Sequence, residues 1–314
     1  MIVAVFNCDA GKLIRTLGSV VRQKNVVTEI IISDDHSAVF PEEEVEAYIS
    51  KCGKPIQIIR NPENLGTVRN VLGAVTQASG KYVFITSPGD YLFDCNTLAY
   101  FYSYAEKYGS KVVFGKAVNY CLSNGELFFE ENMSPNSPGS YNVNCTFYQQ
   151  ICFFFDGLIL GASYFRERET FLKYLRRAAE HFRYTEDSTT TAFYLLEGNN
   201  VSYCDRYIVW YESNTGISSG NSDKWSAILS AEHSLLYDIA EKEYGAPFIR
   251  PYYDFIGESG KLKKWVRLFV THPRMAMILF SVRLRKKKSS QRLPKDTEKR
   301  FLKATNFQDN KVQP

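Results

Sequence analysis

Ile30-Ile31-Ile32-Ser33-Asp34-Asp35 is the stretch that decides the fold, because an apolar, β-branched run ends there on two adjacent acids. A continuous apolar run of this length is typical of a strand buried on both faces, as in a parallel sheet. In open sheets of that kind, ligands bind outside the carboxyl ends of the strands. The stretch therefore predicts an inner strand with an acid pair placed at a ligand-binding edge.

On both sides of this strand, the spacing of the apolar residues alternates between that of a strand and that of a helix. Short apolar runs alternate with segments whose apolar residues recur at helical spacing, such as Leu13, Leu17 and Val20. We expect strands at residues 2–6, 27–33, 55–60, 81–86 and 111–114, and helices at 11–23, 41–50, 64–78 and 94–107. Strands that alternate with helices of about 10–15 residues predict an α/β fold with a mostly parallel sheet flanked by helices.

The second half is expected to be less regular. Residues 115–160 mix Asn, Ser, Gly and aromatic residues, which predicts short strands and loops that face an acceptor. Helices are expected at 164–182 and 185–196, a strand at 201–211, and helices from residue 222 onward. Pro273 should start a helix, since proline suits a first turn and not a helix interior, and it divides the basic C-terminal segment into two helices.

Composition excludes several classes of protein. The chain has 314 residues, of which 45% are hydrophobic and 23% charged, so a large core is available and wholesale disorder is excluded. No run approaches the roughly 20 apolar residues that span a bilayer, and residues 1–6 lack the basic lead-in of a secretory signal. The seven cysteines form no CxxC and no zinc-like spacing with histidine. We therefore expect a protein of the reduced cytoplasm.

Charge is distributed unevenly along the chain. Of the 38 Lys and Arg, ten lie in residues 261–288, where there is no acid, and the other 28 are outnumbered by 34 acids. The same segment carries Phe269, Met277, Phe280 and other apolar side chains, which favours an anionic membrane surface over nucleic acid as its partner. The prediction is a basic amphipathic segment that attaches the protein to the inner face of the cell membrane. Alternatively, its helices pack on the rest of the protein and expose only the Lys and Arg cluster.

Two clusters of polar residues follow the first predicted strands. Asp34 and Asp35 could accept hydrogen bonds from a nucleobase or from ribose hydroxyls, or one of them could simply cap the next helix. In the segment Asn64 to Asn70, Gly66 would let the backbone approach a ligand, and the helix start would favour an anion. Arg69 could pair with one of the strand-end carboxylates. The plainer alternative for this segment is a turn followed by an ordinary helix start.

Two further clusters place acids where chemistry could occur. Asp90, after Ser87-Pro88-Gly89, suits a Mg²⁺ or Mn²⁺ that bridges a diphosphate, although Pro-Gly followed by Asp is also an ordinary turn. Glu186 and Asp187 open a predicted helix, and one of them could be the general base for a hydroxyl. Acids in the first turn of a helix are also common without any catalytic role.

Together, the order and spacing of the four clusters resemble the inverting family 2 glycosyltransferases of the GT-A fold. The matching segments are Gly18 to Gln23, Ser33-Asp34-Asp35-x-Ser37, Asn64-x-Gly66-x-x-Arg69-Asn70, Gly80 to Asp90 and Glu186-Asp187. The resemblance covers about residues 1–220 and is most specific over 1–100. It implies a GT-A domain at 1–220, with a nucleotide-sugar half at about 1–115 and an acceptor half at about 116–220, followed by a C-terminal helical region at 221–314.

The resemblance also implies roles for individual residues. Asp187 is implied to be the base that deprotonates the acceptor hydroxyl, with Glu186 beside it as the next candidate. Asp90 is implied to hold the metal, and Asp35 to read the nucleobase, which is usually uracil. The implied nucleotide-binding residues are Phe6, Asn7, Asp34, Asp35, Asn64, Gly66, Arg69, Ser87 and Gly89.

Two departures from the family's pattern concern cations. Asp90 is the one acid left of the usual acidic run, so metal binding is expected to be weak or to borrow Asp94. The segment Trp210 to Ser218 has neither the Arg nor the His that often closes on the diphosphate.

The expected function is the transfer of a sugar, with inversion, from a nucleotide-diphosphate sugar, UDP-linked by the resemblance, to a hydroxyl of a glycan or lipid-linked glycan. The alternative is a non-catalytic subunit that binds nucleotide or glycan on the same fold, which the thinned acidic run favours. The retained pair Glu186-Asp187 favours the enzyme.

Overall fold

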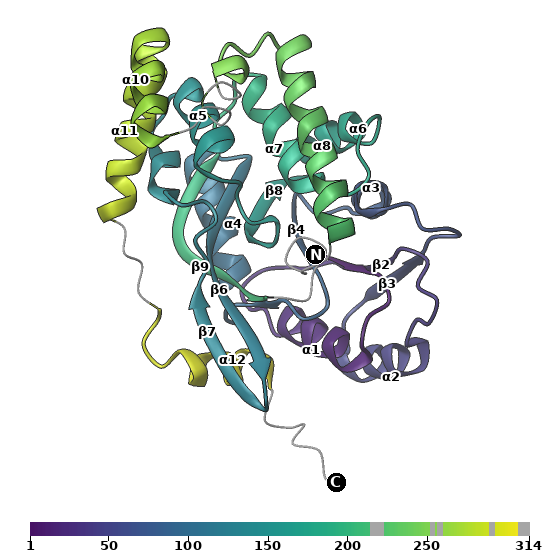
Figure 1. The fold of residues 1–314 in the computed structure, drawn as a ribbon. Coiled ribbons are helices and arrows are strands. Elements are labelled where there is room, and N and C mark those ends of the chain that lie inside the picture. The colour runs from purple at the N-terminus through teal and green to yellow at the C-terminus, as the bar shows by residue number, and fades with distance from the viewer. Residues whose placement is uncertain (214–222, 252–254, 256–259, 289–292, 307–314) are drawn as a thin grey trace.

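The computed structural model describes residues 1–213, 223–251, 255, 260–288 and 293–306. Its central sheet has the strand order β3-β2-β1-β4-β8-β6-β9-β5, and β7 pairs with β6 outside this path (Figure 1). The strands are β1 (Ile2–Val5), β2 (Ile30–Asp34), β3 (Ile56–Arg60), β4 (Tyr82–Thr86), β5 (Tyr91–Leu92), β6 (Val112–Ser123), β7 (Glu126–Glu131), β8 (Tyr164–Glu167) and β9 (Ser202–Glu212).

Helices surround this sheet and extend beyond it. In the N-terminal half they are α1 (Ala10–Val21), α2 (Glu42–Cys52), α3 (Thr67–Gln77) and α4 (Thr97–Tyr108). They continue with α5 (Thr146–Asp156), α6 (Arg168–Ala178), α7 (Glu186–Leu196), α8 (Asp223–Lys242), α10 (Lys261–Thr271), α11 (Pro273–Lys288) and α12 (Thr297–Thr305), and the 3-10 helices are η1 (Pro138–Asn142) and η2 (Gly161–Ser163). The expected start of a helix at Pro273 is confirmed.

The N-terminal half has the predicted alternation. Strand β1 pairs in parallel with β2 and β4, and β2 pairs in parallel with β3, so the carboxyl ends of all four strands lie at one edge. Alternate residues of the strands enter two cores, as the period of two requires. Val3 and Ile32 pack with α1, α2 and α4, whereas Ile2 and Ile31 pack with α3 and α6.

The second half of the sheet is mixed, and it departs from the expected elements. Strand β8 runs antiparallel between β4 and β6, so the residues expected to begin a helix at Tyr164 form a strand first, and the helix starts at Arg168. Strand β6 extends to Ser123 and pairs with β7, where shorter strands were expected. Hydrogen bonding of β8 to β4 and β6, which lie far away in the sequence, outweighs the helical spacing of its apolar residues.

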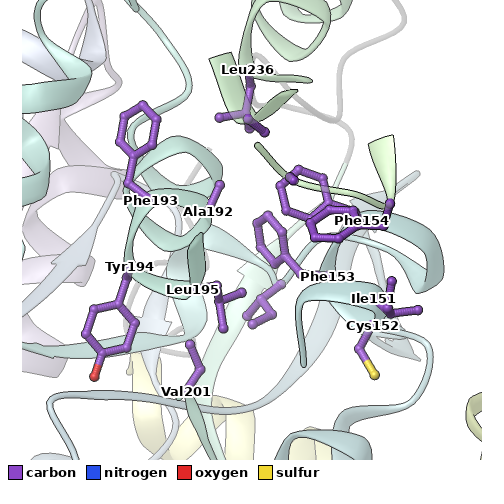
Figure 2. Packing of buried hydrophobic residues seen from close by; sticks show 14 of the residues in the cluster. Ile151, Cys152, Phe153, Phe154, Ala192, Phe193, Tyr194, Leu195, Val201 and Leu236 are labelled. Carbon is purple, nitrogen blue, oxygen red and sulfur yellow. The ribbon is translucent and has the colours of Figure 1, made fainter. Parts of the chain in front are cut away.

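The largest core joins the C-terminal helices to the sheet. Phe153 and Phe154 on α5 and Phe193 on α7 pack with Leu236 on α8 (Figure 2). Helix α11 contributes Leu279 and three further buried residues, Met275, Ala276 and Val282. The expected boundary at residue 220 falls outside the described residues, but the described helices on its two sides share this core.

The last described helix, α12, returns to the opposite end of the molecule (Figure 1). Its Phe301 is fully buried and lies 4.6 Å, between ring centroids, from Tyr120 and 5.4 Å from Trp210. Arg22, directly after α1, also donates a hydrogen bond to the Ala304 carbonyl. None of the helices in the described ranges combines the length and the apolar character that crossing a membrane requires.

Candidate active site

Asp34, the last residue of β2, is fully buried. Its Oδ1 accepts hydrogen bonds from the Ser37 hydroxyl and, at 3.3 Å, from the Ser37 amide. Arg60 Nε lies 3.5 Å from its Oδ2. A buried carboxylate needs such partners, because an unpaired charge there would be costly. Asp34 thus holds the turn after β2 and has its carboxylate directed into the protein.

Asp35 caps a helix, but not the next one along the chain. Its Oδ1 accepts from the Leu65 amide at 2.8 Å and from Asn61 Nδ2 at 3.1 Å, and its Oδ2 accepts from the Gly66 amide at 2.8 Å. These amides precede α3, so the anion expected at this helix start is supplied by Asp35 itself. Three donors on one buried carboxylate leave few positions for a nucleobase.

Asn64 and Gly66 join the start of α3 to the segment before α7. Arg183 Nη2 donates to the Asn64 carbonyl at 2.8 Å and to its side-chain oxygen at 2.9 Å. Val68 N–H donates to the Arg183 carbonyl at 2.9 Å. Gly66 has a φ of 78°, and a Cβ there would lie 2.7 Å from the Arg183 carbonyl, so a larger residue would force the two segments apart.

Arg69 points away from the strand ends. Its Nη2 donates to the Ala179 carbonyl at 2.9 Å, just beyond α6. The expectation that Arg69 pairs with a strand-end carboxylate is therefore wrong, and Arg60 is the cation beside Asp34. The physical reason is helical geometry, since Arg69 lies on the exposed face of α3 while its neighbours in the sequence are buried.

An exposed aromatic ring stands at the carboxyl end of β1. Phe6 is 51% exposed, and Asn7 beside it has a φ of 47°. The Asn7 amide donates to Ser37 Oγ at 2.7 Å, and its Oδ1 accepts from the Ala38 amide at 2.9 Å. These bonds fix the turn that presents Phe6, whose ring suits stacking on a planar base. Ser87, after β4, is also exposed.

Asp90 and Glu212 lie together just after β4 and at the end of β9. The Glu212 amide donates to Asp90 Oδ1 at 3.0 Å, and a Cβ on Gly89 would meet Glu212 Oε2 at 2.3 Å. Burial raises the pKa of Asp90 to about 7, and the charge of Glu212 adds to this effect. Lys12, in the first turn of α1, donates to both carboxylate oxygens of Glu212 at 2.7 Å.

The donor set fits a divalent cation. Two neighbouring carboxyl groups share one lysine here, and hard cations take carboxylate oxygens. The described ranges contain no group of three His, Cys, Asp or Glu suited to a metal, so a ligand would have to supply further oxygens. The acid expected as a reserve, Asp94, instead accepts the Asn96 amide at 2.8 Å before α4.

Glu186 and Asp187 begin α7, where a third acid takes up the preceding amides. Glu232, on α8, accepts hydrogen bonds of 2.7–3.2 Å from the Thr185 amide and hydroxyl and from the amides of Tyr184 and Arg183. Asp187 Oδ1 accepts one amide bond, from Ser188 at 2.7 Å. Glu232 thus fixes the segment that leads into α7, and no feature of the sequence marked it as a site residue.

Burial and neighbouring charges shift the pKa values of groups around Glu186 and Asp187. Burial, with the charge of Asp187 adding to it, raises the pKa of Glu186 to about 8. Burial lowers the pKa of His233 on α8, against the charges of Asp187 and Glu232. A Cβ on Gly161, in η2, would lie 2.4 Å from Asp187 Oδ2, so the glycine makes room for this carboxylate.

Arg166 on β8 is a buried cation near this pair. Its guanidinium carbon lies 3.7 Å from the centroid of the Tyr164 ring and 4.5 Å from that of Phe171. Burial lowers its pKa, while the negative charges of Asp187 and Glu186 oppose this effect. Its Nη2 is buried with no hydrogen-bond partner in the described part of the chain. The sequence offered no distinct signal for it, because Arg166 stands in a run of alternating Arg and Glu that ends at Glu169.

Comparisons with known proteins agree with this arrangement. The family model described as "Glycosyl transferase family 2" matches residues 1–179. No curated protein sequence matches the chain.

Among solved structures, TarS 1–349 of S. aureus in complex with UDP-GlcNAc is similar, with a TM-score of 0.55 and 14% identity over 99% of this chain and 92% of that one. The same protein in complex with UDP gives a TM-score of 0.50 and 15% identity, with the same coverage. The longer TarS structure gives 0.53 and 15%, over 93% of this chain and 55% of that one. At these identities the likeness concerns the fold, which is GT-A with a C-terminal helical region, as expected.

Proposed function

Since this chain belongs to glycosyl transferase family 2, we propose that it is an inverting hexosyltransferase that moves a sugar from a UDP-sugar to a hydroxyl of a glycan or lipid-linked glycan. The observation that carries the proposal is the start of α7, where Glu232 holds the preceding segment and one oxygen of the Asp187 carboxylate faces Gly161. A carboxylate that one amide bond holds in place, and whose other oxygen has no hydrogen bond of this kind among the described residues, suits a general base.

Asp187 is the base in this proposal, and Glu186 supports it. A pKa of about 8 keeps a proton on Glu186 near neutral pH, so it cannot take another from the acceptor. Neighbouring carboxyl groups with different proton affinities commonly divide acid and base roles in this way. The buried guanidinium of Arg166 stabilises negative charge on the pair. Asp187 would then take the acceptor's proton as the hydroxyl oxygen attacks the anomeric carbon from the face opposite the leaving group.

The nucleotide would bind across the ends of β1, β2 and β4. The TarS structures, named for complexes with UDP and UDP-GlcNAc, support UDP as the donor nucleotide. Phe6 offers its exposed ring to the base, and Asn7, Asp34, Asp35, Asn64 and Gly66 shape the pocket through the loops that they hold. Exposed Ser87 would face the diphosphate, and Gly89 would shape the turn behind it, since its N–H donates to Thr16 Oγ1 and its carbonyl accepts from the Tyr120 hydroxyl. We place Arg69 at the periphery of the pocket, since its guanidinium binds Ala179.

Mg²⁺ or Mn²⁺ would be held by Asp90 and Glu212 and completed by oxygens of the diphosphate. When bound, the ion would neutralise the departing nucleoside diphosphate. The ammonium of Lys12 lies at the same place and adds positive charge near those phosphates. We place the protein in the cytoplasm, peripheral on the inner face of the cell membrane, where a lipid-linked acceptor would be found.

The test is hydrolysis and transfer with a panel of UDP- and GDP-sugars, with Mn²⁺ and with chelator. We expect UDP release with one UDP-sugar, enhanced by Mn²⁺, and a product whose anomeric configuration, read by proton NMR, is inverted. Retention of configuration would overturn the inverting mechanism. Tight UDP binding without turnover of any donor, under any condition, would favour the non-catalytic binding subunit.

A further inference from the structure

Helices α10 and α11 follow each other along the chain, joined at His272, and form a hairpin at the edge of the molecule (Figure 1). Arg283, in the third turn of α11, places its guanidinium carbon 4.8 Å from the ring centroid of Trp265, near the start of α10. Such a contact requires the two helices to run side by side. One face of the hairpin is anchored in the main core through Leu268 on α10 and Leu279 on α11.

Each helix of the hairpin also exposes an apolar stripe. On α10 the exposed residues are Leu262, Val266, Phe269 and Val270, and on α11 they are Met277, Phe280 and Leu284. Their spacings of three and four residues place each set on one face of its helix. Leu262 and Val270 are 78% and 77% exposed, and Phe280 is 51% exposed. Single exposed apolar residues are ordinary, but seven within 23 positions mark a surface that binds something.

The charges beside these stripes indicate the partner. Lys263, Lys264, Arg267, Arg274 and Arg283 lie on the same two helices, and the whole segment 261–288 contains no acid. The core of a protein interface is depleted of charged residues, and a nucleic acid, bound mainly through its phosphates, would not be served by aliphatic side chains. Apolar stripes bordered by cations of one sign suit the interface of an anionic bilayer, with side chains among acyl chains and cations near phosphates.

We propose that the hairpin α10–α11 docks on an anionic membrane by inserting the exposed residues of its two stripes, while its buried face keeps the catalytic domain attached. This deepens the proposed peripheral location, because the structure separates anchoring residues from inserting ones. Of the apolar residues in the segment, Leu268, Met275 and Leu279 are buried in the protein, and Phe269, Met277 and Phe280 are free to insert. Attachment is through the hairpin's outer face and needs no spanning helix.

The experiment uses the full chain and vesicles of phosphatidylcholine with or without phosphatidylglycerol. Flotation should show binding to the anionic vesicles, weakened by salt, and the Trp265 side chain beside the stripe should report it by fluorescence. The double variant Val266→Glu, Phe280→Glu should bind at least tenfold more weakly. It loses two inserted apolar side chains and gains two negative charges, which the anionic lipids repel. Phe128→Glu, at a residue also 51% exposed but on β7, is the matched control and should bind as the wild type does.

Several outcomes would overturn the proposal. These are equal binding of the double variant and the wild type, equal loss in the Phe128→Glu control, or binding to neutral vesicles alone. A second copy of the chain as the true occupant would appear as a dimer in light scattering that the double variant dissociates, without vesicle binding. Circular dichroism checks that the double variant is folded. Donor hydrolysis in solution should be unchanged in it, so failure of docking and failure of the proposed activity are told apart.

Discussion

Two acid pairs, Asp34-Asp35 and Glu186-Asp187, lie beside helix starts in this protein, and their carboxylates differ in how many backbone amides they bind. At α3, the side chain of Asp35 fills the open amides of Leu65 and Gly66. At α7, Glu232 from another helix fills the corresponding amides, and Asp187 keeps only one such bond. An acid near a helix start is thus available for chemistry only when some other group satisfies the nearby backbone amides.

The largest effect is expected from Asp187→Asn, which should lower the transfer rate about 10²–10⁴-fold, because an amide cannot accept the acceptor's proton. UDP binding, measured by calorimetry, should stay nearly unchanged. Asp94→Asn is the matched control, since Asp94 also accepts an amide bond before a helix, and it should keep wild-type turnover. Full activity of Asp187→Asn would show that Asp187 is not the base and that it, like Asp35, only binds backbone amides.

A pH-dependent effect on stability is expected for Glu186. With its pKa raised to about 8, the folded protein holds a proton that the unfolded chain releases near the ordinary pKa of a glutamate. Stability should therefore fall as pH rises between that value and about 8. Glu186→Gln should remove this dependence and be more stable than the wild type at the alkaline end of this range. Urea unfolding at several pH values measures it, and parallel pH profiles of the two proteins would contradict it.

The next effect concerns Asp35. We expect Asp35→Ala to lower the free energy of unfolding by about 2 kcal/mol, because two amides before α3 lose their acceptor. Asp35→Asn, which retains an acceptor oxygen, should cost less. If instead Asp35→Asn weakens UDP binding strongly while its unfolding in urea matches that of the wild type, Asp35 reads the nucleobase as the family resemblance implied.

The smallest effect tests Asp187 without changing it. Gly161→Ala places a methyl group 2.4 Å from Asp187 Oδ2, so the carboxylate must move and turnover should fall about tenfold. Gly139→Ala is the control, because a Cβ there meets nothing within 4 Å. The loss should appear in kcat with little change in the KM for the donor. An equal loss in both variants would point to a general disturbance.

Sequence periodicity accounts for much of the fold because it reflects local geometry. The β-branched run from Ile30 to Asp34 and the helical spacing of α1 and α3 are written in neighbouring residues, so the parallel half was predictable. Strand β8 was not, since Tyr164–Glu167 becomes a strand only by inserting between β4 and β6. The return of α12 to bury Phe301 beside Trp210 likewise depends on residues about ninety positions apart.

For the site, the sequence predicts which edge of the sheet carries the polar clusters, because parallel strands place their carboxyl ends together. The tertiary structure decided what each acid does there. Asp35 accepts the amides of Leu65 and Gly66. Glu212 lies beside Asp90 and binds the ammonium of Lys12, and Glu232 accepts the amides of the segment before Asp187. The physical reason is that a carboxylate's protonation and availability depend on every donor and charge around it. These groups come from α1, α8, β9 and the turn before α3, which no local pattern in the sequence brings together.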